Sequence, residues 1–147
     1  MNALQLQEYL HTHIPLSKAM QVEAVVVEPE TVILAAPLAP NINHRETVFG
    51  GSAAAIATLA AWSLIHTRLV SAGLASRLVI QRSNMQYDAP IAGEFRARAF
   101  APTEQTWDDF LRMLRKKGRA RIVISAALEY EGQSVGRFEG EFVALDV

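Results

Sequence analysis

Hydrophobic and polar residues alternate with a period of two along much of the chain, which is the pattern of a strand with one buried face. The pattern is clearest in the last third, over residues 119–130 and again after a predicted turn at Glu131 and Gly132. In the second run the inward-facing positions begin at Ser134 and continue to Ala144. The sequence therefore predicts two long strands that form an antiparallel hairpin.

Four earlier segments also have the composition or the alternation of strands. The first two are separated by a predicted turn at Pro29 and Glu30, and in the last one small or aromatic residues alternate with Glu and Arg. The predicted strands cover residues 22–28, 31–37, 76–88 and 93–101. With the terminal hairpin they make six predicted strands.

Two short segments have the spacing of amphipathic helices. The first covers residues 3–12 and ends before Pro15, because proline cannot continue a helix. The second covers residues 107–117, with Thr106 as the predicted N-cap and Gly118 just past its end. Its predicted apolar stripe consists of Trp107, Phe110, Leu111 and Leu114.

A third helical segment, at about residues 51–67, is rich in alanine and apolar on every side. Such a helix has to be surrounded, and its small side chains allow its surroundings to approach closely. A sheet curled around this helix meets both demands, so we expect a single α+β domain over residues 1–147 with the hotdog fold. Ile56, Leu59 and Trp62 should then be shielded from solvent.

The net charge, the absence of cysteine and the apolar runs of the chain exclude several classes of function and location. A net charge of −1 gives no reason to expect binding to nucleic acid or to a membrane surface. There is no cysteine, and His11, His13 and His66 lack the spacing of metal ligands, so we expect neither a disulfide nor a metal site. The N-terminus does not resemble a signal peptide, and the longest apolar run, residues 53–65, is shorter than the roughly 20 residues of a membrane span. We expect a soluble, cytoplasmic protein.

Polar residues crowd into positions 41–47, directly before two glycines and the alanine-rich helix. The order Asn-x-x-x-Thr-x-Phe-Gly-Gly over residues 43–51 resembles the signature of hotdog acyl-CoA thioesterases. A closer similarity, to the thioesterase domain at the C-terminal end of YiiD-type proteins, covers nearly the whole chain. The segments that carry it are "IPLSKAM" (14–20), "FGGS" (49–52), "YDAPI" (87–91) and "GRARIVISAALEY" (118–130). The resemblance implies a thioesterase of fatty acid metabolism.

Thioester hydrolysis needs donors for the developing oxyanion and a positioned water or carboxylate. Backbone N–H groups at the N-terminus of the long helix can supply the donors, supported by the helix dipole. Gly50 and Gly51 let a thioester lie against that backbone, because any Cβ would obstruct it. We expect Asn43 to hold the substrate or the attacking water. Phe49 and Ser52 are expected to contact the substrate at the same place.

The motif departs from the better-known thioesterases at three positions. Phe49 stands where they have histidine, Glu46 where they have glycine, and Thr58 where their long helix carries the catalytic acid. A threonine can orient water but is a poor base. The candidate bases are therefore Glu46 and Asp88, with His44 as a third, while Thr58 supplies a secondary hydrogen bond.

Basic residues gather near the end of the helix predicted at 107–117. They are either the solvated end of that helix or a surface that attracts the phosphates of coenzyme A or an acidic acyl carrier protein. Arg115, Lys116 and Lys117 are our predicted substrate-binding members of this group. Six bases fall within ten positions: Arg112, Arg115, Lys116, Lys117, Arg119 and Arg121.

Three functions fit these observations, in decreasing order of support. The first is hydrolysis of an acyl thioester, with coenzyme A or phosphopantetheine as part of the substrate and no separate cofactor. The second is a non-catalytic module that binds acyl-CoA or acyl carrier protein, in which Asn43 only caps a turn and Thr58 only bonds to its own helix. The third is a hotdog dehydratase or hydratase, although no closely spaced Asp/His or His/Glu pair stands out. Because one hotdog sheet has free edges, we expect a homodimer or a dimer of such dimers.

Overall fold

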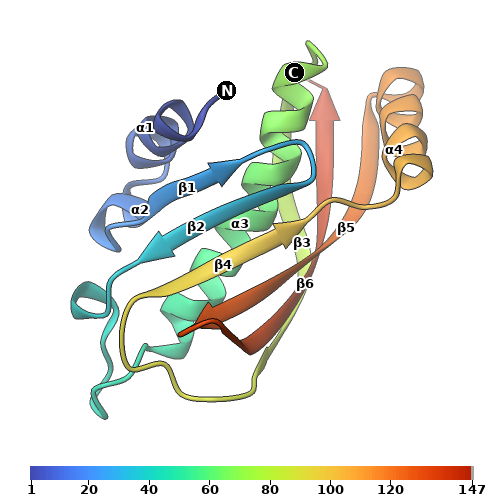
Figure 1. Cartoon of the computed structure of the whole chain (residues 1–147). Coiled ribbons are helices and arrows are strands. Elements are labelled where there is room, and N and C mark those ends of the chain that lie inside the picture. The colour runs from blue at the N-terminus through green and yellow to red at the C-terminus, as the bar shows by residue number, and fades with distance from the viewer. Residues whose placement is uncertain (147) are drawn as a thin grey trace.

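Helix α3 (Gly50–Ser71), 22 residues long, runs across one face of a six-stranded antiparallel sheet in the computed structural model, which describes residues 1–146 (Figure 1). The strands lie in the order β1-β2-β4-β5-β6-β3, and the sheet curls so that β2 and β3, near opposite ends of this order, both contact α3. This arrangement confirms the predicted α+β hotdog fold. All six predicted strands are present: β1 (Glu23–Val27), β2 (Thr31–Ala36), β3 (Ser76–Tyr87), β4 (Phe95–Phe100), β5 (Arg119–Tyr130) and β6 (Gln133–Asp146).

The core lies between α3 and the sheet. Eleven of the 22 residues of α3 are buried, among them Ile56 and Leu59, as the sequence predicts. Trp62 is half-buried, and its indole Nε1 donates a hydrogen bond to the Leu78 carbonyl of β3 at 2.9 Å. By length and composition alone α3 is apolar enough to cross a membrane, but most of its apolar stretch is enclosed within this fold.

Two helices precede the sheet. Helix α1 (Ala3–His13) matches the predicted segment and packs beside β1, with Leu6 and Leu10 buried in the core. Pro15 ends this segment as predicted, but it also begins a second helix, α2 (Pro15–Ala19), which the sequence analysis missed. Proline suits the first position of a helix because its missing N–H is not needed there and its φ is already helical.

Helix α4 (Glu104–Lys117) connects β4 to β5 and begins three residues before the predicted start. Its N-cap is Thr103 rather than the predicted Thr106, and the Thr103 hydroxyl accepts a hydrogen bond from the Thr106 N–H at 3.2 Å. Both threonines suit an N-cap, but capping at Thr103 also places Glu104 in the first turn, where it interacts favourably with the helix dipole. Gly118 has a left-handed φ of +71°, in keeping with its predicted place past the end. Three residues of the predicted stripe are buried, namely Trp107, Phe110 and Leu114.

Strands β5 and β6 form the predicted hairpin, but the alternation of β6 changes phase near its start. Leu128 pairs with Gly136 whereas Glu129 pairs with Ser134, so Val135 is an extra residue in β6. This β-bulge leaves Ser134 exposed and Val135 buried. The predicted inward position of Ser134 is therefore wrong, because a bulge shifts the side-chain alternation by one residue.

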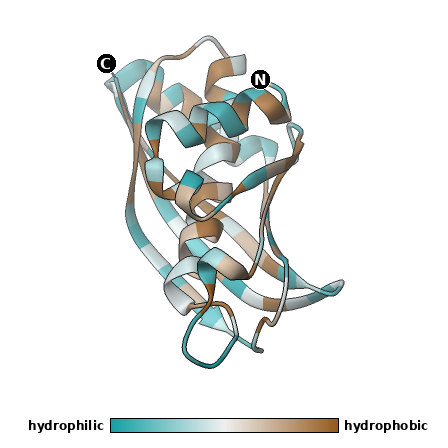
Figure 2. Ribbon diagram, turned by 90° about the vertical axis from the view of Figure 1, so that its left-hand side faces the viewer, coloured by the Kyte–Doolittle hydropathy of each residue, from teal (hydrophilic) through white to brown (hydrophobic). Residues whose placement is uncertain are grey.

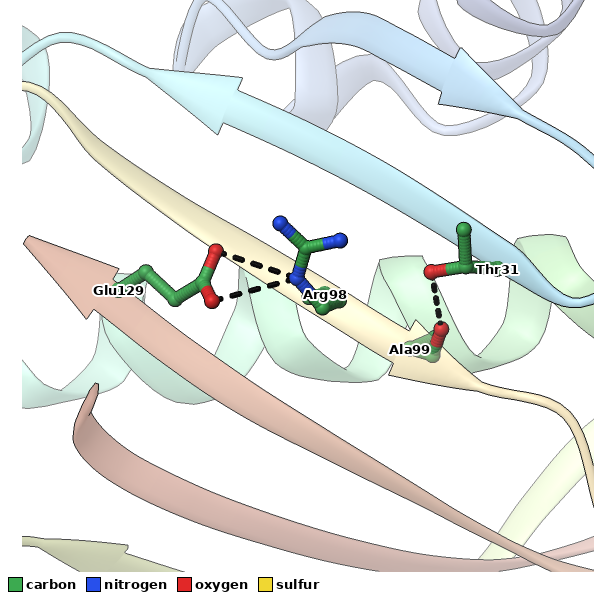
Figure 3. Close-up of polar contacts among 4 residues, drawn as sticks. All are labelled: Thr31, Arg98, Ala99 and Glu129. Carbon is green, nitrogen blue, oxygen red and sulfur yellow. Dashed lines mark hydrogen bonds and ion pairs between the residues drawn. The ribbon is translucent and has the colours of Figure 1, made fainter. Parts of the chain in front are cut away.

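The face of the sheet opposite α3 carries polar side chains. Buried and exposed residues alternate along β4 and β5, and hydrophobic and hydrophilic colours alternate on ribbons of the sheet in Figure 2, as expected when one face is buried. Strand β2 is instead buried along most of its length. On the outer face the Arg98 guanidinium is paired with the Glu129 carboxylate at 3.2 Å, and nearby the Thr31 hydroxyl donates to the Ala99 carbonyl at 2.7 Å (Figure 3). These contacts tie β2, β4 and β5 together.

Strand β3 is one edge of the sheet, and most of its 12 residues are exposed. Val79 and Ile80 keep 45% and 39% of their surface in solvent. On the helix, Ala54, Ala55 and Thr58 are half-buried. A free edge of this length, with apolar side chains on it, is a surface that proteins usually cover.

Candidate active site

The first turn of α3 has no side-chain cap. Its N-cap residue is Phe49, and the first helical hydrogen bond runs from the Ala53 N–H to the Phe49 carbonyl at 3.1 Å. The N–H groups of Gly50, Gly51 and Ser52 therefore have no acceptor within the helix. Free N–H groups at a helix N-terminus, with the helix dipole behind them, attract negative charge. This end of α3 is chemically suited to stabilise an oxyanion.

A tight loop before α3 holds the side chain of Asn43 in one orientation. Its Oδ1 accepts hydrogen bonds from the backbone N–H groups of Arg45 at 2.8 Å and Thr47 at 3.1 Å. Its Nδ2 donates to the Thr47 hydroxyl at 3.0 Å but lies 3.4 Å from the Val48 carbonyl, which is long for a hydrogen bond. One hydrogen of the amide is thus weakly used and is chemically available to another acceptor.

A cavity of about 380 Å³ lies beside the start of α3, within the size range of small-molecule sites. Gly50 and Ala53 line it from α3, and Tyr87 and Asp88 line it from the end of β3. Its inner wall is apolar, whereas its rim carries a phenol and a carboxylate. Such a cavity can hold an apolar chain inside and a polar group at the rim. The buried side chains of the wall are Val48, Ile91, Leu128 and Val135.

Asp88 is the predicted base that lines this cavity. Its carboxylate accepts hydrogen bonds from the Arg137 guanidinium at 3.2 and 3.3 Å, and these raise the pKa of Arg137. The backbone at Asp88 is anchored to the bulge, because the N–H groups of Asp88 and Ala89 both donate to the Val135 carbonyl, at 2.9 and 3.2 Å. The carboxylate is thus held at the rim from both its side chain and its backbone.

The other predicted polar residues do not line the cavity. His44 and Glu46 are exposed on the loop before α3, and Glu46 has a left-handed φ of +63°. Ser52 is half-buried on the first turn of α3. Thr58 lies farther along the helix, and its hydroxyl donates to the Ala54 carbonyl at 2.8 Å. The structure therefore brings together the first residue of α3 and Asp88. The predicted polar residues of α3 and of the loop before it that do not line that cavity are Asn43, His44, Glu46, Ser52 and Thr58.

Tyr87 is a residue of this site to which the sequence analysis gave no role. Its hydroxyl donates to the Gly50 carbonyl at 3.0 Å, and a Cβ on Gly50 would lie 3.5 Å from its ring. The ring of Phe49 lies across the neighbouring glycine, where a Cβ on Gly51 would collide with it. In the sequence, only its position next to the candidate base Asp88 hints at a role for Tyr87. Its contact with a residue 37 positions earlier cannot be read from the sequence.

The predicted phosphate-binding residues Arg115, Lys116 and Lys117 lie on α4, away from this cavity. Helix α4 meets α3 near the C-terminal end of α3, where the Arg68 guanidinium lies 4.4 Å from the centre of the Trp107 ring. In Figure 1 α4 is at the upper end of the molecule, and α3 begins at the lower end. A helix of 22 residues is about 33 Å long, so within one chain these bases are remote from the cavity.

Aromatic rings cover the C-terminal half of α3. The rings of Tyr9, Trp62 and His66 form a cluster, in which the His66 centroid lies 4.6 Å from each of the other two. Burial lowers the pKa of His66, and the nearby His13 lowers it further. Burial is also the main cause that lowers the pKa of Arg68. Side chains of α1 and α4 therefore contact this half of the helix, although Arg68 and other residues near its end also line a cavity of about 330 Å³.

Comparison with known proteins agrees with this fold. Residues 3–146 match the family model described as "Putative thioesterase (yiiD_Cterm)". A solved structure of a protein of unknown function from Chlorobaculum tepidum TLS is 32% identical, covers 99% of this chain and 94% of that chain, and superposes with a TM-score of 0.94. These matches confirm the resemblance identified from the sequence.

More distant structures share the architecture. A putative thioesterase from Shewanella oneidensis is 24% identical, with 97% of this chain and 96% of that chain covered and a TM-score of 0.87. A thioesterase from Haemophilus influenzae is 11% identical, with 99% and 92% covered and a TM-score of 0.75. At such identities the likeness concerns the fold.

Proposed function

Since the chain belongs to the family described as "Putative thioesterase (yiiD_Cterm)" and its enzyme class is thioester hydrolase, we propose that its substrates are acyl thioesters of coenzyme A or of an acyl carrier protein. The observation that carries this proposal is the cavity of about 380 Å³ at the uncapped N-terminus of α3. Its buried apolar wall suits an acyl group. The Asp88 carboxylate and Gly50, the first residue of the uncapped helix, both line it, which supports a site where a base and the backbone donors for an oxyanion act together.

We assign the chemical roles as follows. The N–H groups of Gly51 and Ser52, together with Nδ2 of Asn43, donate to the thioester carbonyl oxygen as it becomes negative. Asp88 accepts a proton from water while the water oxygen bonds to the carbonyl carbon. The tetrahedral intermediate then collapses, the carbon–sulfur bond breaks, and the thiolate leaves and takes up the proton from Asp88. The products are a carboxylic acid and a free thiol.

Arg137 acts on this step through Asp88. Its two hydrogen bonds keep the carboxylate at the cavity rim and leave part of the lone-pair capacity of the two oxygens for water. Arg137 is therefore a positioning residue in the proposal.

The second candidate, an acyl-binding module without catalysis, is favoured by one observation. Thr58 occupies the place where the related enzymes carry a helix carboxylate, and its hydroxyl is bonded to its own helix. In that case the apolar wall would bind the acyl group, and Asp88 would only hold the end of β3 through Arg137.

We also propose a homodimer joined through β3. This strand offers a free edge of 12 residues, with Val79 and Ile80 exposed and a half-buried face of α3 close by. Pairing two such edges would continue the sheet and cover these side chains. Light scattering at working concentrations tests this, and a monomer would contradict it.

Release of free thiol from a panel of acyl-CoA substrates tests the proposed hydrolysis. Asp88→Asn keeps the shape of the side chain and removes its charge, so turnover should fall by a factor on the order of 100 or more. Glu46→Gln is the matched control on the exposed loop, and its turnover should stay within about twofold. If Glu46→Gln loses activity and Asp88→Asn keeps it, the base is Glu46 on the loop before α3. Tight acyl-CoA binding without thiol release by the wild type would favour the second candidate.

A further inference from the structure

Tyr87 is the last residue of the edge strand β3 and stands at the rim of the cavity. Its hydroxyl donates to the Gly50 carbonyl at 3.0 Å and its ring packs on Gly50, yet 57% of the residue is exposed. We propose that Tyr87 is a gate that selects substrates by the size of the acyl group. This inference rests on the proposed function and adds a specificity-determining residue to it.

The ring of Tyr87 is the adjustable part of the cavity wall. The inner residues Val48, Ala53, Ile91 and Leu128 are buried in the core, where close packing fixes their positions. Within one chain the Tyr87 ring contacts Gly50 on one side and is otherwise exposed, so the core does not fix its position. It can therefore change the width of the cavity without opening a void in the core.

The hydrogen bond from the Tyr87 hydroxyl to the Gly50 carbonyl holds the ring in its closed position. The Gly50 carbonyl already belongs to the first turn of α3, so the helix does not need Tyr87 to satisfy it. An exposed hydrogen bond between neutral groups favours the closed position only several-fold. A bulky acyl group that gains contact with the apolar wall could thus displace the ring, whereas a small acyl group fits with the ring closed.

Phe49 is a second aromatic residue at the start of α3, and it does not meet the conditions for a gate. It is as exposed as Tyr87, at 57%, and it also lies against a glycine of the motif. However, it does not line the cavity and has no polar group that could hold it in one position. Of these two rings, only that of Tyr87 both lines the cavity and is held in place by a hydrogen bond.

The test is the chain-length profile of hydrolysis. The ratio of kcat/KM for decanoyl-CoA to kcat/KM for acetyl-CoA is measured for the wild type, Tyr87→Phe and Tyr87→Ala. Tyr87→Ala removes the wall, so this ratio should rise by about tenfold or more. Tyr87→Phe keeps the ring and loses the hydrogen bond, so the ratio should rise by a smaller factor. Phe100→Ala, which removes a 45% exposed aromatic ring from the end of β4, is the control and should leave the ratio unchanged.

An unchanged ratio in Tyr87→Ala would overturn the gate while thiol release by the wild type still supports hydrolysis. A wild type that releases no thiol from any substrate would instead overturn the proposed hydrolysis. Calorimetric binding of thioether analogues of the same two acyl-CoA substrates tests the gate in that event. Tyr87→Ala must then strengthen binding of the decanoyl analogue relative to the acetyl analogue, and equal changes for both would overturn the gate.

Discussion

At the C-terminal end of α3 the Arg68 guanidinium stacks on Trp107 and the Ala72 N–H donates to the Arg68 carbonyl, whereas at the N-terminal end no side chain caps the N–H groups of Gly50 and Gly51. Side chains of α1 and α4 pack against the first end, where a cavity of about 330 Å³ lies beside Arg68 and Trp107, and the cavity of the candidate site lies beside the other end. Leaving donors unpaired gives up stabilisation that a cap would add. The difference teaches that one helix can serve stability at one end and chemistry at the other.

The largest effect should come from the packed end. Trp107→Ala removes a buried indole and the surface on which Arg68 stacks, so the free energy of unfolding should fall by about 3–5 kcal/mol. Denaturant unfolding measures this loss. The folded fraction should keep its turnover, because the cavity lies at the other end of the helix. A fall in kcat under conditions where the variant is fully folded would contradict the division between the ends.

Asn43→Ala acts on the open end. It removes the proposed amide donor and the hydrogen bonds that Oδ1 accepts in the loop, so turnover should fall by a factor on the order of 100. The loss of loop hydrogen bonds should also lower stability by about 1–2 kcal/mol. Activity and melting temperature are measured together. Full activity would show that Asn43 only caps the turn.

Gly51→Ala separates activity from stability at the open end. A Cβ at this position collides with the Phe49 ring and covers the N–H groups, so turnover should fall by about tenfold. Stability should hold or rise, since the exposed Phe49 ring can turn away from the new Cβ and alanine is favoured over glycine in a helix by about 1 kcal/mol. Gly73→Ala is the matched variant at the packed end, where a left-handed φ of +71° makes alanine cost about 1–2 kcal/mol. Gly73→Ala should keep its turnover. A loss of turnover in Gly73→Ala together with full turnover in Gly51→Ala would contradict the assignment of chemistry to the N-terminal end of α3.

The smallest effect should be the pH dependence of the packed end. Burial lowers the pKa of His66 below its usual 6.5, so the folded protein favours the neutral ring. Its contribution to stability is therefore complete above pH 6.5 and is lost as the pH falls from 6.5 toward the lowered pKa. His66→Phe keeps a ring in the stack and removes the titration, so its free energy of unfolding should be flatter over this window. His11 and His13 are present in both proteins, and an equal slope in both would show that His66 does not contribute.

Most of the fold could be predicted because burial leaves a period in the sequence. The alternation of β5 and the all-round apolar character of α3 follow directly from which faces are covered. The errors have local causes. Thr103 and Thr106 are equally good caps on composition, and the bulge at Val135 has no signature in the alternation that precedes it. Pro15 predicts the end of a helix, but proline can equally begin one, as it does in α2.

The candidate site was less predictable because it depends on distances between separate elements. The motif at residues 43–51 indicates the helix N-terminus, but the sequence alone could not choose between Glu46 and Asp88 as the base. The structure places Asp88 at the cavity and Glu46 on the exposed loop. The contact between Tyr87 and Gly50 depends on how β3 ends beside α3, which is a property of the folded sheet.

Because of the bulge at Val135, the length of the hairpin between β5 and β6 indicates whether a related sequence has this candidate site. The Val135 carbonyl anchors the backbone of Asp88, and its side chain forms part of the cavity wall. A related sequence that is one residue shorter between the turn and Gly136 could pair β5 and β6 regularly and keep all six strands. It would lose the anchor that holds the carboxylate at the rim. An alignment gap at this position therefore separates relatives that inherit only the architecture from relatives that also inherit the site.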